Sequence, residues 1–502
     1  MEAQTLFKFF SFLSLICIIS NAQLQSKQDG FISVSISEKG LDFLKDLLTD
    51  KAISSLTPLE LPPIERTVRI LLVGRVKIVL SNIVIYHIDV LSSNVEVDDD
   101  EIKITASKAT ANLSMDWKYT YQNWFVEVSD QGKASVEVED MEVGLKVSLE
   151  NQHGGLKLSL LDSKCDVQDV DIKMDGGASW LYQGVVDAFS DHIESAVENA
   201  IVKKLNEGIS KIGSLLQSLP TEIQVDDTSV LNVTFVGDPI LSDSSIGLVI
   251  NGLFIPSNRA LSATYQHRIS HASVPCYTPA KMIAMSLHED VFNSASSVYF
   301  NAGLMQWRVN KIPDQSLLNT TEWKEVVPQL YEQFPDARMV LDILVDSPPS
   351  VHVFDGGMEA TINTDVTVDV VKDGEVIPVA CGSVVVSASG SVEISGNNLT
   401  GGIELNKFDL SVKWSKIGNL ETDMIEPIIS EVLKDVLLPH LNLFLIKGFP
   451  LPLIHGFTLK DAEIVYSDSM ITVCSDVSFT EDNHLLAKYQ SISDIFSFLS
   501  FM

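Results

Sequence analysis

Apolar side chains recur at every second position along much of the segment from Thr67 to Met174, with polar residues between them. Turn sequences rich in Asp, Gln and Gly interrupt this alternation. A period of two predicts β-strands that bury one face and expose the other. The clearest examples are the sets Val76, Ile78 and Leu80, and Val136, Val138, Met141, Val143, Leu145 and Val147.

Two long segments follow a helical period instead. The first runs from Trp180 to Leu219 and the second from Glu421 to Ile446, so they begin about 240 residues apart, roughly half the chain. Because strand patterns precede each helix, this spacing predicts two copies of one half-molecule. The apolar positions are Val185, Phe189, Ile193, Val197, Ile201 and Leu205 in the first helix, and Ile425, Ile428, Ile429, Val432, Leu433, Val436, Leu437 and Leu441 in the second.

Shorter patterns complete each half. Ser37–Leu56 is predicted to be a helix with Ser37 as its N-cap, and Ala280–Gly303 is predicted to be another. Pro439 predicts a kink in the second long helix. Strands are expected at 351–371, 376–386, 405–414, 457–465 and 470–477. Each half is therefore expected to contain a helix, strands and a long helix, an α+β class with a barrel or wrapped sheet against helices.

The first 22 residues have the features of a secretory signal peptide. Lys8 precedes the apolar run Phe9–Ile19, and Ser20 and Ala22 provide the small residues of a cleavage site. No later stretch is long and apolar enough for a transmembrane segment. We therefore expect a secreted, extracellular glycoprotein. N-glycosylation sequons, some of which chance alone would produce, begin at Asn112, Asn232, Asn319 and Asn398.

The charge balance and the motifs limit the function classes. The net charge is −32, from 35 basic and 67 acidic residues, so repulsion disfavours nucleic acid as a partner. No nucleophile motif, phosphate loop or nucleotide fingerprint is found, and no metal or cofactor is expected. We predict a protein that is not an enzyme. The sequence leaves disulfide pairing open among the four cysteines beyond the signal peptide, Cys165, Cys276, Cys381 and Cys474.

Two features of the N-terminal half point to a lipid surface. The segment 117–125 has five aromatic residues in nine, typical of a hairpin that inserts into a membrane interface; ordinary cross-strand packing is the alternative. The second feature is a group of basic residues, which we call the basic island. In so acidic a chain, such a group is suited to binding phosphate groups, and the alternative interpretation is a solvated strand face. The candidates are Trp117, Lys118, Tyr119, Tyr121, Trp124 and Phe125 in the segment, and Arg66, Arg69, Arg75 and Lys77 in the island.

Short motifs in both halves, in one consistent order, resemble those of a known family. The chain is similar to the bactericidal/permeability-increasing and lipopolysaccharide-binding protein (BPI/LBP) family, and looks most like its plant branch. The matching motifs in the first half are Gly177–Leu181, Ile193–Ala196 and Leu219-Pro220; those in the second are Phe292–Ala295, Val298-Tyr299 and Lys447–Pro452.

The resemblance implies an elongated boomerang of two similar β-barrels, each with long helices packed against it, joined by a central antiparallel sheet. It also implies an apolar pocket in each half for phospholipid acyl chains. Ordinary core packing is the alternative for each pocket residue. By helical phase, the expected pocket residues are Leu41, Leu44, Leu48, Val197, Ile201 and Leu205 in the first half, and Ile428, Val432 and Leu441 in the second.

Several family members bind lipopolysaccharide at the tip of the N-terminal barrel, which would place it here at the basic island and the aromatic segment. Mammalian-type members also have a disulfide between a strand and the long N-terminal helix. Cys165 occupies the strand position of that bridge, but Asn206 occupies the helix position, which argues against the bridge in this chain.

The resemblance and the patterns together predict a domain organisation. We expect a signal peptide at 1–22, an N-terminal barrel domain at 23–220, a central sheet or linker at 221–252, a C-terminal barrel domain at 253–485 and a short apolar tail at 486–502. The predicted function is binding of phospholipid and of lipopolysaccharide, or of a bacterial outer-membrane surface, in innate immune sensing. The alternative is lipid transfer, or carriage of small apolar ligands, without lipopolysaccharide recognition.

Overall fold

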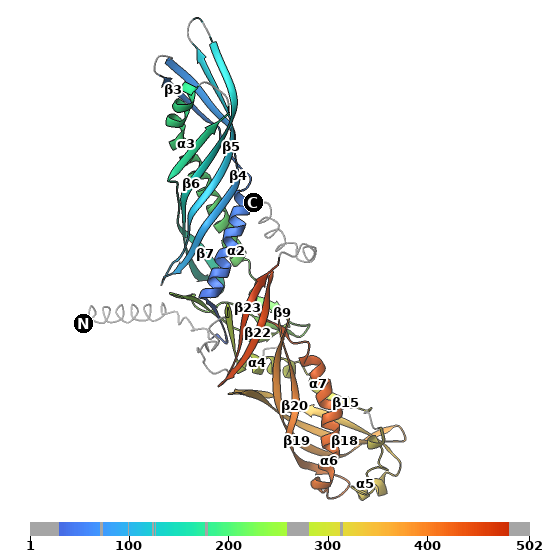
Figure 1. Ribbon diagram of the computed structural model, residues 1–502. Coiled ribbons are helices and arrows are strands. Elements are labelled where there is room, and N and C mark those ends of the chain that lie inside the picture. The colour runs from blue at the N-terminus through green and yellow to red at the C-terminus, as the bar shows by residue number, and fades with distance from the viewer. Residues whose placement is uncertain are drawn as a thin grey trace, which may run out of the picture.

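The fold is elongated, with one strand-rich unit at each end and a sheet between them (Figure 1). It was analysed in a computed structural model that describes residues 30–70, 74–98, 100–122, 125, 127–175, 179–258, 281–311 and 315–480. The predicted signal peptide at 1–22 and apolar tail at 486–502 lie outside the described residues.

The N-terminal unit is one antiparallel sheet of seven strands. Long hairpins dominate it because the period-two pattern continues for more than 20 residues in its central strands. β3 (Ile64–Ile70) pairs with β4, and β8 (Asp169–Met174) pairs with β6. The main strand order is β2 (Leu59–Leu61), β4 (Gly74–Val97), β5 (Ile102–Gln122), β6 (Glu127–Gln152) and β7 (Gly155–Asp166).

Two helices pack on this sheet, as predicted. α2 spans Glu38–Leu56, and the hydroxyl of its N-cap Ser37 accepts a hydrogen bond from the Gly40 N–H at 3.3 Å. α3 spans Ser179–Gln217. Its apolar side chains recur at every fourth position and form a stripe that is buried in the core of the unit. The stripe packs against the inward-facing side chains of β4, β5 and β6, so the sheet and α3 share one interior.

Neither large sheet closes into a barrel within the described part of the chain, which corrects the predicted barrels. In the N-terminal unit, α3 packs against both edge strands, β2 and β7. The helix therefore covers the opening that hydrogen bonds between edge strands would close in a true barrel. None of the helices formed by the described residues combines the length and the hydropathy needed to cross a membrane.

The central sheet has six antiparallel strands and draws on both ends of the chain, not on 221–252 alone. β1 follows the undescribed N-terminal residues, and β22 and β23 close the described chain. A separate small sheet contains β9 (Glu222–Gln224), β10 (Ser229–Asn232) and β13 (Phe254–Pro256). The order of the central sheet is β11 (Ile240–Ser242), β12 (Ser245–Ile250), β1 (Ile32–Ser37), β14 (Ile283–His288), β23 (Met470–Phe479) and β22 (Phe457–Ser467).

The predicted helix Ala280–Gly303 is wrong in its first part. Its described start forms β14, and only Glu289–Asn301 is helical, as α4. β14 pairs with β1 on one side and β23 on the other, so sheet pairing overrides the helical pattern there. His288 marks the change, because its ring Nδ1 accepts the Asp290 N–H at 3.2 Å and caps α4.

The C-terminal unit repeats the plan of a sheet with a long helix. β17 (Ser350–Phe354) pairs with β18, and the unit also has a 3-10 turn, η1 (Gln315–Leu318), and a short helix, α5 (Pro328–Gln333). The strand order is β15 (Gln306–Val309), β16 (Arg338–Val345), β18 (Gly357–Lys372), β19 (Glu375–Ser395), β20 (Asn398–Ser415) and β21 (Phe449–Pro450).

The second long helix is divided rather than continuous. α6 (Thr422–Val432) leads into a π-helical turn, η2 (Leu433–Leu437), and then into α7 (Leu438–Leu445). Pro439 has no N–H for the carbonyl four residues before it, that of Asp435, and Asp435 lies inside the π-helical turn. The interruption predicted at Pro439 therefore takes the form of a wider helical turn just before it.

Candidate functional site

The predicted basic island lies on the hairpin of β3 and β4, but its members divide between two faces. Arg69 lies directly opposite Arg75, and Lys77 lies opposite Thr67, on the outer face of the sheet. Arg66 occupies the alternate face, where its Nη2 lies 3.2 Å from Nδ1 of His192 on α3. The island therefore presents three basic side chains outward rather than four.

Lys118 on β5 joins these three. It is exposed and lies opposite Val79, while Lys77 lies opposite Thr120, so Lys118 and Lys77 are diagonal neighbours on adjacent strands. We call Arg69, Arg75, Lys77 and Lys118 the basic face. Lys77 Nζ lies 2.6 Å from Glu65 Oε1, and both side chains are more than half exposed. Such a surface ion pair is weak, so Lys77 remains available to a phosphate.

The aromatic segment does not form a wedge at Trp117 and Tyr119, so that prediction is wrong for these two residues. Trp117 is 1% exposed, its Nε1 donates to the Lys133 carbonyl at 3.1 Å, and its ring stacks on that of buried Tyr119 with centroids 6.2 Å apart. Tyr121 is half-buried against the same core. Residues 117, 119 and 121 share one face of β5, and the alternation of the strand directs that face inward.

Phe125 differs from these three, since it is 70% exposed beyond the end of β5. It lies between Gln122, where β5 ends, and Glu127, where β6 begins. Trp124 lies outside the described residues. The exposed part of the predicted aromatic tip within the described chain is therefore Phe125, and the other three described aromatics belong to the interior.

The apolar residues predicted to line the first pocket fall into four environments. Val197 and Ile201 are fully buried in the main core, and Leu205 packs against that core. Leu41 belongs to a second buried cluster with Ile209 and Ile246. Leu44 is half-buried. Leu48 is exposed on the surface of α2, so it does not line a closed interior.

The C-terminal unit contains an apolar cavity of about 90 Å³ between α6 and the sheet. Of the three residues expected here from helical phase, Ile428 and Val432 line this cavity, while Leu441 packs against a neighbouring cluster. The remaining walls come from α5, η1, the strands and the turns between these elements, which helical phase alone does not indicate. Those walls include Leu318, Trp323, Leu330, Met339, Leu341, Val366, Val368, Val384 and Leu410.

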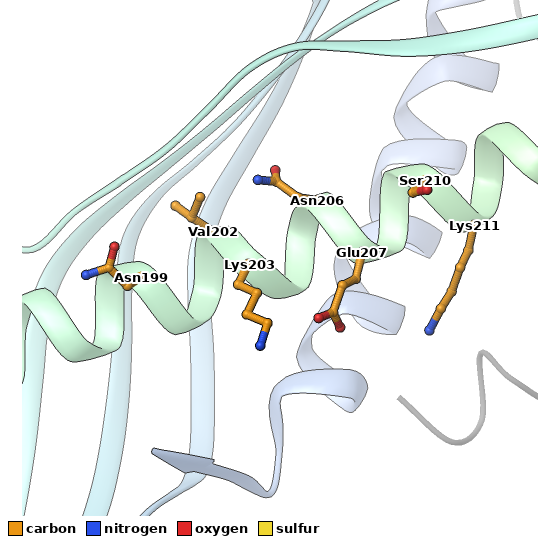
Figure 2. Close-up of a pocket in the computed structure, with 7 residues that line it drawn as sticks. All are labelled: Asn199, Val202, Lys203, Asn206, Glu207, Ser210 and Lys211. Carbon is orange, nitrogen blue, oxygen red and sulfur yellow. The ribbon is translucent and has the colours of Figure 1, made fainter. Parts of the chain in front are cut away.

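A second hollow runs along the surface of α3 and was not predicted. It is a shallow feature of about 690 Å³ that opens widely to solvent, and its lining consists of seven residues of α3 alone. Figure 2 shows Lys203, Glu207 and Lys211 extending in the same direction from the helix. Six of the seven lining side chains are polar, so the hollow provides little apolar contact for an acyl chain. The full lining is Asn199, Val202, Lys203, Asn206, Glu207, Ser210 and Lys211.

The family disulfide is absent at Cys165, as expected. Cys165 is a free, buried thiol, and burial, with smaller contributions from Glu198 and Asp166, raises its pKa to about 12. At the helix position, Asn206 Oδ1 instead accepts a hydrogen bond from the Ser163 hydroxyl at 2.7 Å. Cys381, which lines the C-terminal cavity, is also free, whereas Cys474 is disulfide-bonded.

The four sequon asparagines lie on ordered backbone and are half-buried. Asn112 is in β5 and Asn398 in β20. Asn232 Oδ1 accepts hydrogen bonds from the N–H and hydroxyl of Thr234, and Asn319 Oδ1 accepts the Thr321 N–H at 2.9 Å. In both sequons the side chain therefore bonds to the threonine of its own motif, and glycan attachment stays a prediction.

Both units match domains of a known protein family. Residues 40–219 match the N-terminal domain of the LBP/BPI/CETP family, and 223–479 match its C-terminal domain. A BPI/LBP family protein of Arabidopsis thaliana is 48% identical, covering 92% of this chain and 95% of its own length.

Animal relatives are more distant. Human lipopolysaccharide-binding protein is 23% identical, with 93% of this chain and 98% of that protein covered. Rat bactericidal permeability-increasing protein is also 23% identical, over 94% and 98%. The crystal structure of a lipopolysaccharide-binding protein has the same fold, with a TM-score of 0.65, 18% identity, and coverage of 90% of this chain and all of that one. This chain belongs to the LBP/BPI/CETP family.

Proposed function

We propose that this protein is a secreted lipid-binding protein that holds phospholipid acyl chains in its interior and binds lipopolysaccharide at the basic face, as part of innate immune sensing. The observation that carries the proposal is the C-terminal cavity, whose walls include 21 residues, none of them charged. Burial of each acyl CH₂ in such an environment contributes about 0.8 kcal/mol, so no charged anchor is needed.

The volume of the cavity sets a condition on this proposal. About 90 Å³ is below the roughly 300–1,000 Å³ of typical ligand pockets. A diacyl lipid therefore fits only if α6 moves away from the sheet. The divided helix favours such a movement, because the π-helical turn Leu433–Leu437 lies directly after α6.

Lipopolysaccharide binding is proposed for the basic face on chemical grounds. Arg69, Arg75, Lys77 and Lys118 are exposed together on one face of three adjacent strands, and guanidinium and ammonium groups bind phosphate. Phe125, which is exposed beyond the end of β5, offers an apolar contact in the same unit. Relatives named for lipopolysaccharide binding, the human protein among them, support the same ligand class.

The test of the basic face is a charge reversal, Arg69→Glu with Arg75→Glu and Lys77→Glu. We expect lipopolysaccharide binding to weaken roughly tenfold or more, because three phosphate partners become repulsive. The matched control reverses Lys157 and Lys164 on β7 and Lys173 on β8, which changes the net charge by the same amount away from the strands of the basic face. Equal affinity of the two variants in calorimetry would remove the basic face as the binding site.

A carrier of small apolar ligands, without lipopolysaccharide recognition, is the second candidate. The small volume of the cavity favours it, since an unmoved interior of about 90 Å³ admits only a few methylene groups. Native mass spectrometry of the protein purified without detergent separates the two. Bound masses of diacyl phospholipids support lipid holding, small bound masses support the carrier, and no bound mass would count against both.

A further inference from the structure

The C-terminal end of α7 exposes four consecutive large apolar side chains. Leu443, Phe444, Leu445 and Ile446 are 64%, 59%, 39% and 69% exposed. Isolated exposed apolar residues are ordinary on protein surfaces, but a contiguous group at one helix end marks an interaction surface. We call residues 443–447 the exposed helix end; Lys447 completes it.

The exposed helix end is held firmly in this orientation. Asn442 accepts the Ile403 N–H at 2.8 Å and donates to the Ile403 carbonyl at 3.1 Å, so it pins α7 to β20. Leu437 and Leu438 are buried at the start of α7. These contacts fix the rotation of the helix about its axis. Leu443 and Ile446 are therefore presented outward by the packing of α7 and not by a loose chain end.

The turn after α7 is equally constrained. Gly448 has a φ of 61°, and a Cβ at this position would lie 2.1 Å from the Leu399 carbonyl oxygen. The chain turns there directly into β21, which pairs with the start of β20. The end of α7 is thus fastened on both sides of the exposed residues, and its apolar surface is a fixed feature of the fold.

The sequence that contains the exposed helix end has an unusual charge composition for this protein. No Asp or Glu occurs between Val436 and Lys460, although the protein has 67 acidic residues and a net charge of −32. Lys447 Nζ lies 5.7 Å from the centre of the Phe444 ring. An apolar helix end with a neighbouring lysine, in a run of the chain without acidic residues, suits a phospholipid surface, where the apolar side chains enter the acyl boundary and the ammonium reaches a phosphate.

We propose that the exposed helix end docks the protein on a phospholipid bilayer. The bilayer is zwitterionic, because the large negative charge of the whole protein opposes approach to an anionic one. A protein partner would also cover apolar surface, but the carboxylate-free run with Lys447 fits phosphate head groups better. This docking lies in the C-terminal unit and does not depend on which ligand the interior or the basic face binds.

The test is flotation of the full chain with phosphatidylcholine vesicles. Leu443→Gln with Ile446→Gln removes two outward apolar side chains, keeps helix-compatible residues and should fold normally. We expect the vesicle partition coefficient to fall about tenfold or more. The matched control is Leu91→Gln with Leu161→Gln, which alters side chains that are 74% and 53% exposed in the N-terminal unit, and it should change binding less than about twofold.

Three results would overturn the proposal: no vesicle binding by the wild-type protein, equal loss in both double variants, or a wild-type dimer in sedimentation that the Leu443→Gln/Ile446→Gln variant dissociates. The last would make the face a contact between copies. Native mass spectrometry of the same variant measures interior lipid separately. Retained interior lipid with lost flotation supports bilayer docking, whereas absent interior lipid in every variant would count against lipid holding and leave the docking result standing.

Discussion

The N-terminal and C-terminal units share one plan but use their interiors differently. In the N-terminal unit a continuous α3 of 39 residues packs on the sheet, and Trp117 and Phe189 are among its largest fully buried side chains. In the C-terminal unit the corresponding helix is divided by a π-helical turn, and an apolar cavity lies between its first segment and the sheet. The duplicated pattern therefore gives one interior that buries large aromatic side chains and one that contains an apolar cavity.

The surfaces of the two units also differ. The N-terminal unit has the basic face on β3, β4 and β5, whereas the C-terminal unit has the apolar helix end of α7. Since a basic surface suits phosphate groups and an apolar one suits acyl chains, the two halves are suited to different parts of a lipid. The difference suggests that duplication was followed by division of tasks, and the predictions below test it.

The largest expected change in the free energy of unfolding comes from a buried aromatic side chain of the N-terminal unit. Trp117→Ala removes a fully buried ring and its hydrogen bond to Lys133, and should lower the free energy of unfolding by about 3–5 kcal/mol. Phe125→Ala, at an exposed position, should change it by less than about 0.5 kcal/mol. Chemical denaturation measures both. Similar values for the two variants would mean that Trp117 is not part of a packed core.

A smaller effect should distinguish the two interiors directly. Val197→Phe adds volume to a packed core and should cost about 1–3 kcal/mol of stability. Ile428→Phe adds volume beside the C-terminal cavity and should cost less than about 1 kcal/mol, because empty space accepts the ring. The Ile428 variant should also lose the lipid proposed to occupy the C-terminal cavity, as measured by native mass spectrometry. Equal destabilisation by the two substitutions would show that the interiors are alike.

Much of this contrast could not be predicted from sequence, although the elements could. The long helices and the strands of both units follow local periodicity, so their positions were predictable. β14 was missed because its pairing with β1 joins residues about 250 positions apart, and a short apolar run does not distinguish strand from helix. A cavity is likewise a property of how several elements pack, and no single period encodes it.

For Trp117, in contrast, the sequence already contained the information needed to predict its burial. It shares its face of β5 with Leu113 and Met115, both buried, so the alternation already placed it inward. The density of aromatic residues favoured a surface wedge only if strand phase was ignored. The division of the basic island has the same origin. Arg66 and Arg69 are an odd number of positions apart on one strand, so their side chains lie on opposite faces. Strand phase therefore decides which residues of a motif can act together.

The smallest expected effect concerns pH and the C-terminal unit. Burial, together with the neighbouring Asp342 carboxylate, raises the pKa of Asp369 above its usual value, and Arg308 only partly opposes this. A carboxyl group whose folded pKa is raised contributes stability that is fully present below its unfolded pKa and is lost as pH rises through the folded value. Ionisation of Asp369 should therefore weaken this unit as pH rises above the usual carboxyl value of about 4 and through the raised pKa of Asp369.

Asp369→Asn tests this sign, because the amide stays neutral at every pH. The variant should be more stable than the wild type at pH 7, by on the order of 1 kcal/mol or less, and the difference should shrink toward pH 4. Asp409→Asn, at an exposed position of β20, removes the same charge without the burial and should leave the pH profile unchanged. If Asp369→Asn is less stable than the wild type at pH 7, then the ion pair with Arg308 outweighs burial, and the charged carboxylate supports the C-terminal unit instead of weakening it.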